Sequence, residues 1–156
     1  MNSMDSFCIK WNEFEVNIRE SFKNLRKDQA LFDVTLATED GQHIQAHKMI
    51  LSAGSKFFND IFMRMNHSNL LIYLKGTSSG QLESVLDFLY NGEAAVVQED
   101  VELFIKTGQD LQVKGFKDEL AGAGVNASLL QTGDQRRMKI YGNVKYVANK
   151  QFQNQA

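Results

Sequence analysis

His43 and His47 stand four residues apart in the stretch HIQAHKMILSA, and this spacing can serve a zinc site. Two imidazoles at positions i and i+4 bind one metal ion only when both lie on the same helix. Apolar and polar residues alternate up to His43, whereas helical spacing begins at His47. Gln45 and Ala46 also offer no carboxylate base. We therefore predict an exposed strand histidine and a partly buried histidine at a helix start, and no metal site.

The residues around the two histidines predict a β-hairpin followed by two helices. LFDVTLAT alternates apolar and polar side chains, Asp40-Gly41 is a turn pair, and QHIQA alternates again. A helix starts at His47, and Ser55 is a suitable N-cap for the next one. The hairpin and helix pair would therefore position both histidines.

The middle of the chain predicts a strand and a capped helix. NLLIYL has the composition of a short buried strand. In the next segment Ser78 and Gln81 have capping-box spacing, and Asn91-Gly92 is a stop signal. We expect a helix between these signals.

The following segment predicts a strand and two short helices. AAVV at 94–97 is strand-like, and the pattern after it is helical with a break near Gln112. Gly108 within the first helix costs about 1 kcal/mol relative to alanine, so we expect it to lie against a neighbouring backbone. The whole order predicts an α+β domain over residues 1–120, with a small sheet and clustered helices.

Residues 121–156 read as a flexible, polar and basic tail. Residues 138–147 have the pattern of a small hairpin, but a lone hairpin is marginal in water, so we predict mostly disorder. The cations Arg136, Arg137 and Lys139 are compatible with a nuclear-import patch or with simple solvation.

Charge and cysteine content limit the classes of function. Residues 1–120 carry 12 Lys and Arg against 18 Asp and Glu, whereas residues 121–156 carry 5 against 1. Such an acidic domain is a poor candidate for direct nucleic-acid binding. The single cysteine, Cys8, cannot form an internal disulfide, and the N-terminal residues lack an apolar run of signal-peptide or membrane length. These features are typical of a cytosolic or nuclear protein.

An apolar stripe runs through the N-terminal segment. Phe7 and Ile9 alternate with polar residues and lead into a helical pattern. The helical stripe consists of Trp11, Phe14, Ile18, Phe22 and Leu25. Periodicity alone leaves open whether this stripe packs within its own chain or against a second copy.

Three separated motifs resemble the BTB (POZ) family. DVTLATEDGQHIQAHKMILSAGSKFFNDIF resembles the central hairpin and helix pair of BTB domains. FCIKWNEFEVNI resembles the amino-terminal signature of BTB domains of the tramtrack group, which is found in arthropod transcription factors. LDFLYNGEAAVVQEDVELFIKTGQDLQVKGF resembles the carboxy-terminal half of the same domains. The resemblance covers about residues 6–118, and it departs from the group's pattern at Gly54, Lys56 and Gly108.

The resemblance implies a BTB/POZ fold with a domain-swapped N-terminal strand in a dimer. Residues 7–10 would pair with 94–97 of a second copy, and the helical stripe would pack near the two-fold axis. The implied dimer interface is Phe7, Ile9, Trp11, Phe14, Ile18, Phe22, Leu25, Ala95 and Val96. Asp33 and Lys48 would form a charged pocket near this interface, serving either packing or partner binding.

The resemblance also implies a protein-interaction module of a nuclear transcription regulator, without catalysis or cofactor. Its expected partners are itself as a homodimer or higher oligomer, other BTB-domain transcription factors and corepressors, with neither membrane nor direct DNA contact. The alternative is a substrate adaptor for a cullin ubiquitin ligase. MRMNHSN lacks the hydrophobic-x-Glu pattern associated with cullin binding. No P-loop, dinucleotide motif or nucleophile elbow supports an enzyme.

Overall fold

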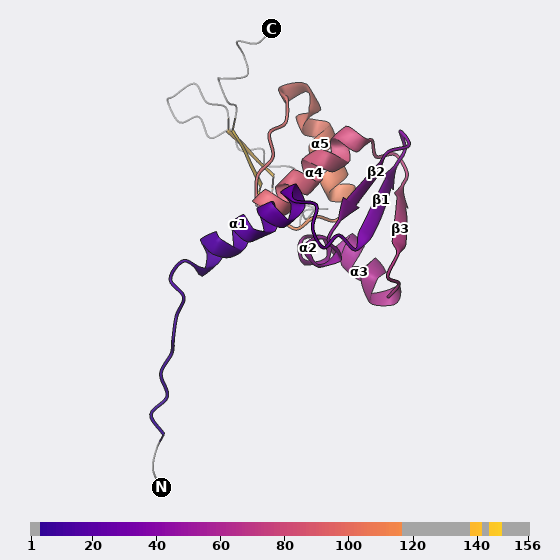
Figure 1. Ribbon diagram of the computed structural model, residues 1–156. Coiled ribbons are helices and arrows are strands. Elements are labelled where there is room, and N and C mark those ends of the chain that lie inside the picture. The colour runs from indigo at the N-terminus through magenta and orange to yellow at the C-terminus, as the bar shows by residue number, and fades with distance from the viewer. Residues whose placement is uncertain (1–3, 117–137, 142–143, 148–156) are drawn as a thin grey trace.

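The computed structural model describes residues 4–116 and the backbone of two short strands at 138–141 and 144–147 (Figure 1). The elements are α1 (Phe14–Lys27), β1 (Val34–Thr38), β2 (His43–Ala46), α2 (Lys48–Gly54), α3 (Lys56–Arg64), β3 (Leu70–Leu74), α4 (Ser79–Asn91), the 3₁₀ turn η1 (Gln98–Asp100), α5 (Val101–Asp110), β4 (Met138–Tyr141) and β5 (Val144–Val147). The predicted α+β class is confirmed. None of the described helices is long and apolar enough to cross a membrane.

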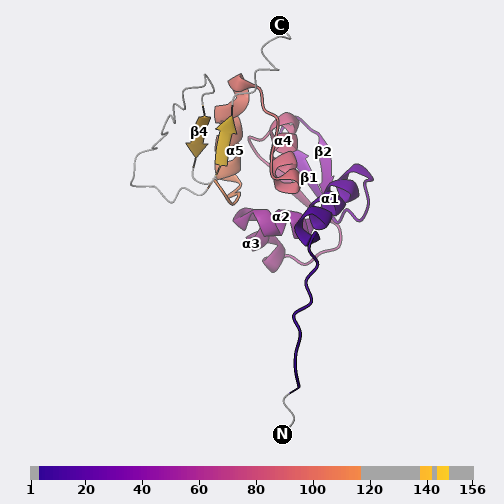
Figure 2. The same cartoon turned by 90° about the vertical axis from the view of Figure 1, so that its left-hand side faces the viewer.

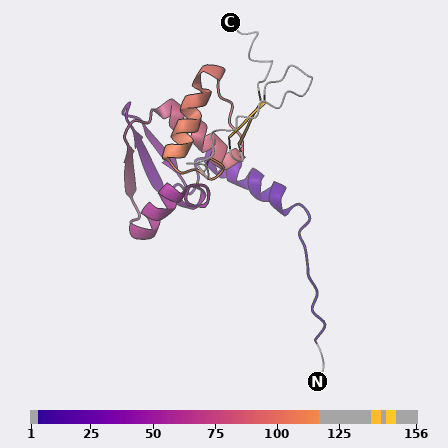
Figure 3. The ribbon, with the colours of Figure 1, turned by 180° about the vertical axis from the view of Figure 1, so that it is seen from behind.

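The sheet has three strands in the order β2-β1-β3. β1 and β2 form the predicted antiparallel hairpin, and β3 pairs with β1 in parallel. Leu36 in the central strand is paired with Ile44 on one side and Ile72 on the other, and it is fully buried. Helices α4 and α5 lie together on one side of the sheet (Figures 1 and 3). The core therefore forms between the sheet and these helices.

The hairpin turn also supports the start of α4. Gly41 has φ of 80°, and the Thr38 N–H donates to the Gln42 carbonyl at 2.9 Å. The Asp40 carboxylate accepts from the backbone N–H of Ser79 at 3.0 Å and from its hydroxyl at 2.6 Å. One turn residue thus joins the hairpin to α4, and the Asp40-Gly41 prediction is confirmed.

Hydrogen bonds from Ser79, and secondarily from Thr38, hold the pKa of Asp40 below its ordinary value of 3.8. Because the folded-state pKa is the lower one, ionised Asp40 stabilises the fold above the unfolded pKa. This contribution is lost as the pH falls through the folded pKa. We expect Asp40→Asn to be less stable than the wild type at pH 7, with a difference that shrinks below about pH 4. Urea unfolding at pH values from 7 to 3 measures the difference in the free energy of unfolding between the two proteins. A difference that stayed constant over this range would contradict a stabilising role for ionised Asp40.

Local capping signals explain where the helices begin and end. The Ser55 hydroxyl accepts from the Phe58 N–H at 3.2 Å, as expected of an N-cap. Ser78 and Gln81 form the predicted capping box, and Gly92 ends α4 with φ of 77°. These short-range predictions are confirmed.

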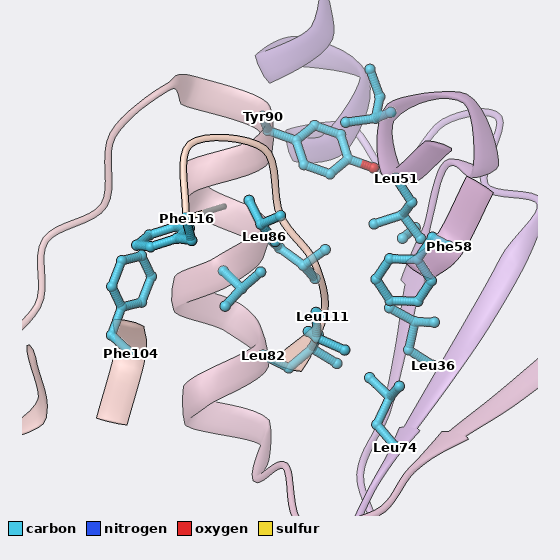
Figure 4. Close-up of a cluster of buried hydrophobic side chains, with 14 of the residues drawn as sticks. Leu36, Leu51, Phe58, Leu74, Leu82, Leu86, Tyr90, Phe104, Leu111 and Phe116 are labelled. Atoms are coloured by element: carbon cyan, nitrogen blue, oxygen red, sulfur yellow. The ribbon is translucent and has the colours of Figure 1, made fainter. Parts of the chain in front are cut away.

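The core is dense and aromatic on the helical side (Figure 4). Phe58 from α3 is fully buried. The ring centroid of Phe116 lies 5.2 Å from that of Phe88 and 5.5 Å from that of Phe104, so three segments meet around one ring. Such edge and tilted contacts are favourable arrangements for aromatic pairs.

Gly108 contacts a side chain, whereas the sequence predicted a backbone. A Cβ added at Gly108 would lie 2.8 Å from the Phe116 ring, closer than atoms can approach without movement. We expect Gly108→Ala to destabilise the domain by about 1–3 kcal/mol through overpacking, less the gain of up to about 1 kcal/mol in helix propensity. Gly80→Ala in α4 is the control because its Cβ meets nothing within 4 Å. In thermal unfolding we expect a Tm below that of the wild type for Gly108→Ala and not for Gly80→Ala. Equal Tm values for the two variants would contradict the contact between Gly108 and Phe116.

Four other predictions need correction. The second short helix expected beyond Gln112 does not begin within the described residues, because residues 111–116 after α5 form turns and an isolated bridge from Val113 to Ser55. β3 is not a fully buried strand, because Leu71 and Tyr73 are exposed on it. Residues 94–97 form no strand with any other described residue. In the tail, β4 pairs antiparallel with β5, so the prediction of mostly disorder is wrong at these eight residues. The pairing is the one expected of the small hairpin whose pattern residues 138–147 carry.

Candidate interaction surfaces

The N-terminal arm, defined as residues 4–13, is extended and runs away from the rest of the chain (Figure 1). Phe7 and Ile9 are 85% and 94% exposed. Trp11 lies in the turn before α1 and not on the helix, where the stripe had placed it, and its ring stands edge-on to Phe14 at 5.4 Å. Both rings are more than half exposed. The arm is therefore an apolar strip without a covering surface in the described part of the chain.

Exposure falls along the predicted stripe on α1. Phe14 is exposed, Ile18 and Leu25 are half-buried, and Phe22 packs against the core of its own chain. The beginning of α1 thus offers apolar surface outward, while its end is part of the domain. The end of the stripe thus packs within its own chain, whereas packing of its exposed beginning against a second copy stays a prediction.

A charged cluster fixes the end of α1 on α4. The Arg26 guanidinium donates to Asp87 at 2.5 Å and to Glu83 at 2.8 Å. It also lies over the Tyr90 ring, 5.1 Å from the centroid. The Arg26 guanidinium therefore bridges two different carboxylates on α4, and because both carboxylates are about half exposed, this bridge sets the direction of α1 more than it adds stability. The direction of α1 in turn sets where the N-terminal arm leaves the domain.

The segment 94–97, predicted as the partner of the arm, alternates in exposure. Ala94 and Val96 pack against the core, whereas Ala95 and Val97 face solvent. This alternation is what a half-buried strand has, although no strand pairs with it here. The structure therefore places Ala95 outward and Val96 inward.

The side chain of Asp33 contacts the backbone of Lys48. The Asp33 carboxylate accepts from the Lys48 N–H at 2.7 Å, which satisfies a free donor at the start of α2. The Lys48 ammonium donates to the His67 carbonyl at 2.6 Å. Among the ion pairs of the described residues, none joins the two side chains, and Asp33 is exposed. The two residues are thus adjacent as predicted, with a cap in place of a buried ion pair.

The two histidines lie as the sequence predicted. His43 is exposed on β2, and His47 is buried at the N-cap of α2. The His47 ring has Nε2 2.6 Å from the Ala30 carbonyl and Nδ1 2.6 Å from the Tyr90 hydroxyl. Both ring nitrogens are therefore engaged within the fold. Within residues 4–116, no group of three or more His, Cys, Asp or Glu is placed to hold a metal ion.

The BTB/POZ domain family matches residues 22–125 of the chain. The chain belongs to the BTB/POZ family. It is 42% identical over 118 residues to Longitudinals lacking protein-like of Drosophila melanogaster, covering 76% of this chain and 92% of that protein. It is 42% identical to Sex determination protein fruitless and 38% identical to Protein tramtrack, alpha isoform, of the same organism, each over 72% of this chain.

The chain spans only 12% of fruitless and 14% of the tramtrack isoform, so these relatives are far longer than the region that matches. The predicted resemblance to the tramtrack group of BTB domains is confirmed. A BTB domain of this group is a protein-interaction module.

Sequence reasoning did not identify the residues that hold α1 on this BTB domain. Arg26 and its partners are separated by 57 and 61 residues, and no local pattern links them. The burial of Tyr90 was also missed, although it lies four residues after Leu86 and eight after Leu82 and so continues the buried face of α4. In the tail, Arg136 and Arg137 lie outside the described residues, and of Lys139 only the backbone in β4 is described.

Proposed function

We propose that this BTB domain is a homo- and hetero-oligomerisation module of a nuclear transcription regulator and performs no catalysis. The observation that supports the proposal is the N-terminal arm, with Phe7 and Ile9 almost fully exposed. Burying a large apolar side chain contributes about 1.5–3 kcal/mol. A contiguous exposed apolar strip of this kind marks an interaction site.

The proposed interface joins the arm of one copy to residues 94–97 of the other. Both segments alternate in the way that paired strands require, and Ala95 and Val96 lie in the middle of the receiving segment. Burial of Phe7, Ile9, Trp11 and Phe14 would contribute roughly 6–12 kcal/mol for each of the two arms of a dimer. Association costs an estimated 4–15 kcal/mol once per dimer, so the two arms together can offset it, and the strand hydrogen bonds add to their contribution.

We propose other BTB-domain transcription factors and corepressors as further partners. Relatives include Zinc finger protein chinmo and Broad-complex core protein isoforms, at 37% and 36% identity. Contact with DNA would then come through a partner, because residues 1–120 carry an excess of acidic residues. Asp33 and Lys48 would border a partner groove, and Arg136, Arg137 and Lys139 would serve nuclear import.

The mass of the full chain in solution tests self-association. We expect light scattering after size exclusion to give at least twice the chain mass of 17.7 kDa across a hundredfold range of concentration. A value that settles at a whole multiple above two would identify a second interface. A folded chain that stays at 17.7 kDa would contradict the proposal.

A further inference from the structure

A groove of about 300 Å³ lies where the end of β3 meets α5, and we refer to it as the β3–α5 groove. β3 contributes Tyr73 and Leu74 with the following Lys75, and α5 contributes Leu103, Lys106 and Thr107. None of the residues of the N-terminal arm lines it. The groove is therefore separate from the proposed self-association surface.

The rim of the β3–α5 groove carries apolar surface that the core does not use. Tyr73 is 58% exposed and Leu103 is 44% exposed. α5 turns Phe104 and Ile105 into the core, so Leu103 lies on the outer side of the helix. Half-buried Phe57 and buried Leu111 complete the lining. An apolar side chain of a ligand could pack against the buried lining residues and against the exposed residues at the rim of the groove.

The charge of the groove is opposite to that of the domain. Lys75 and Lys106 line it, and Asp110 is the one acidic residue among the lining residues. Neither lysine takes part in an ion pair with another described residue. The surrounding residues 1–120 carry six more acidic than basic side chains. Two cations without partners in an acidic domain favour a ligand with carboxylates.

The free edge of β3 sets the shape of the ligand. β3 is the end strand in the order β2-β1-β3, so only one of its edges is paired within residues 4–116 (Figures 1 and 3). Alternate residues of a strand at the edge of a sheet leave backbone N–H and C=O groups free to pair with an added strand. The segment from Leu70 to Leu74 carries neither a charge nor a proline that would protect this edge.

We propose that the β3–α5 groove binds an extended acidic peptide segment of a partner protein. The segment pairs with the free edge of β3, places an apolar side chain against Tyr73 and Leu103, and directs carboxylates to Lys75 and Lys106. Edge pairing supplies affinity, and the two lysines select acidic sequences.

The test uses two fluorescein-labelled nonapeptide pools and the full chain. One pool has degenerate apolar residues at alternate positions followed by three glutamates, and the other has glutamines in place of the glutamates. We expect the acidic pool to bind in fluorescence anisotropy, and to bind more weakly as salt rises. Lys75→Glu with Lys106→Glu should weaken binding at least about tenfold, which corresponds to about 1.4 kcal/mol.

The matched control is Lys27→Glu with Lys114→Glu, which changes the net charge equally at two exposed lysines outside the groove. Leu103→Ser tests the apolar contact without adding charge. Equal weakening by both lysine pairs, or equal binding of the glutamine pool, would overturn the proposal. Loss of the oligomer in Lys75→Glu with Lys106→Glu would also overturn it, because the groove would then be an interface between copies. Since the oligomer and the peptide are measured separately, the self-association proposal can fail while this one stands.

Discussion

The double variant Phe7→Ser and Ile9→Ser is expected to reduce the BTB domain to a folded 17.7 kDa monomer. Both side chains are almost fully exposed in the single chain, so their loss removes nothing from the core. Each would contribute about 1.5–3 kcal/mol when buried in the assembly, and the four such losses of a two-fold dimer weaken association by roughly 10⁴–10⁹-fold. Light scattering measures the mass, and far-UV circular dichroism measures the retained helix.

The control for this variant is Met63→Ser with Met65→Ser, which removes two exposed apolar side chains outside the N-terminal arm. Its mass is expected to equal that of the wild type. If the arm variant kept the wild-type mass, the arm would not be the interface. If the methionine variant dissociated equally, the assembly would depend on another surface.

Phe22→Asp would be a less informative test than the sequence had indicated. The stripe predicts Phe22 at the dimer interface, so a carboxylate there would break the dimer. In the structure Phe22 packs against the core of its own chain. The substitution would place a carboxylate against apolar residues and destabilise the monomer itself. A lost dimer would then not distinguish a lost interface from a lost fold.

Most of the fold could be predicted because its signals are local. The Asp40-Gly41 turn, the Ser55 cap and the Ser78–Gln81 capping box each act over a few residues. The switch from strand to helix between His43 and His47 was equally readable, because alternation stops where helical spacing begins.

The sequence could not predict the contacts that orient α1 and fill the core. The hydrogen bonds of His47 reach Ala30 and Tyr90, which are 17 and 43 residues away. Gly108 meets a ring from beyond the end of its helix. Asp33 binds a backbone N–H, which no pattern of charged residues reveals. The alternation of apolar residues in a strand likewise does not reveal whether its partner strand belongs to the same chain or to a second copy.

The hydrogen bonds between His47 and Tyr90 form a closed set whose donors can be assigned. The Ala30 carbonyl can only accept, so His47 Nε2 carries the proton that it shares with this oxygen. In the neutral ring Nδ1 then accepts from the Tyr90 O–H. The Tyr90 oxygen in turn accepts from the His47 backbone N–H at 3.0 Å. Burial raises the pKa of Tyr90, so the hydroxyl keeps its proton.

Tyr90→Phe is therefore expected to destabilise the domain strongly although it removes a single oxygen atom. His47 Nδ1 and the His47 N–H would both lose their partner in a buried position, at about 1–3 kcal/mol each. Urea unfolding at one fixed protein concentration measures the loss, because unfolding of an oligomer depends on concentration. Tyr73→Phe is the control, since this exposed hydroxyl should be worth no more than about 0.5 kcal/mol.

A double-mutant cycle with His47→Ala separates the side-chain hydrogen bond from the rest of the loss. We expect a coupling of about 0.5–3 kcal/mol between the two positions, because they are in direct contact. The His47 N–H persists in the alanine variant, so Tyr90→Phe should still be destabilising there. If its effect vanished completely in the His47→Ala background, the backbone bond would contribute nothing. If instead the two substitutions were additive, the 2.6 Å contact would not stabilise the fold, and the Tyr90 hydroxyl would hold the start of α2 only through the His47 N–H.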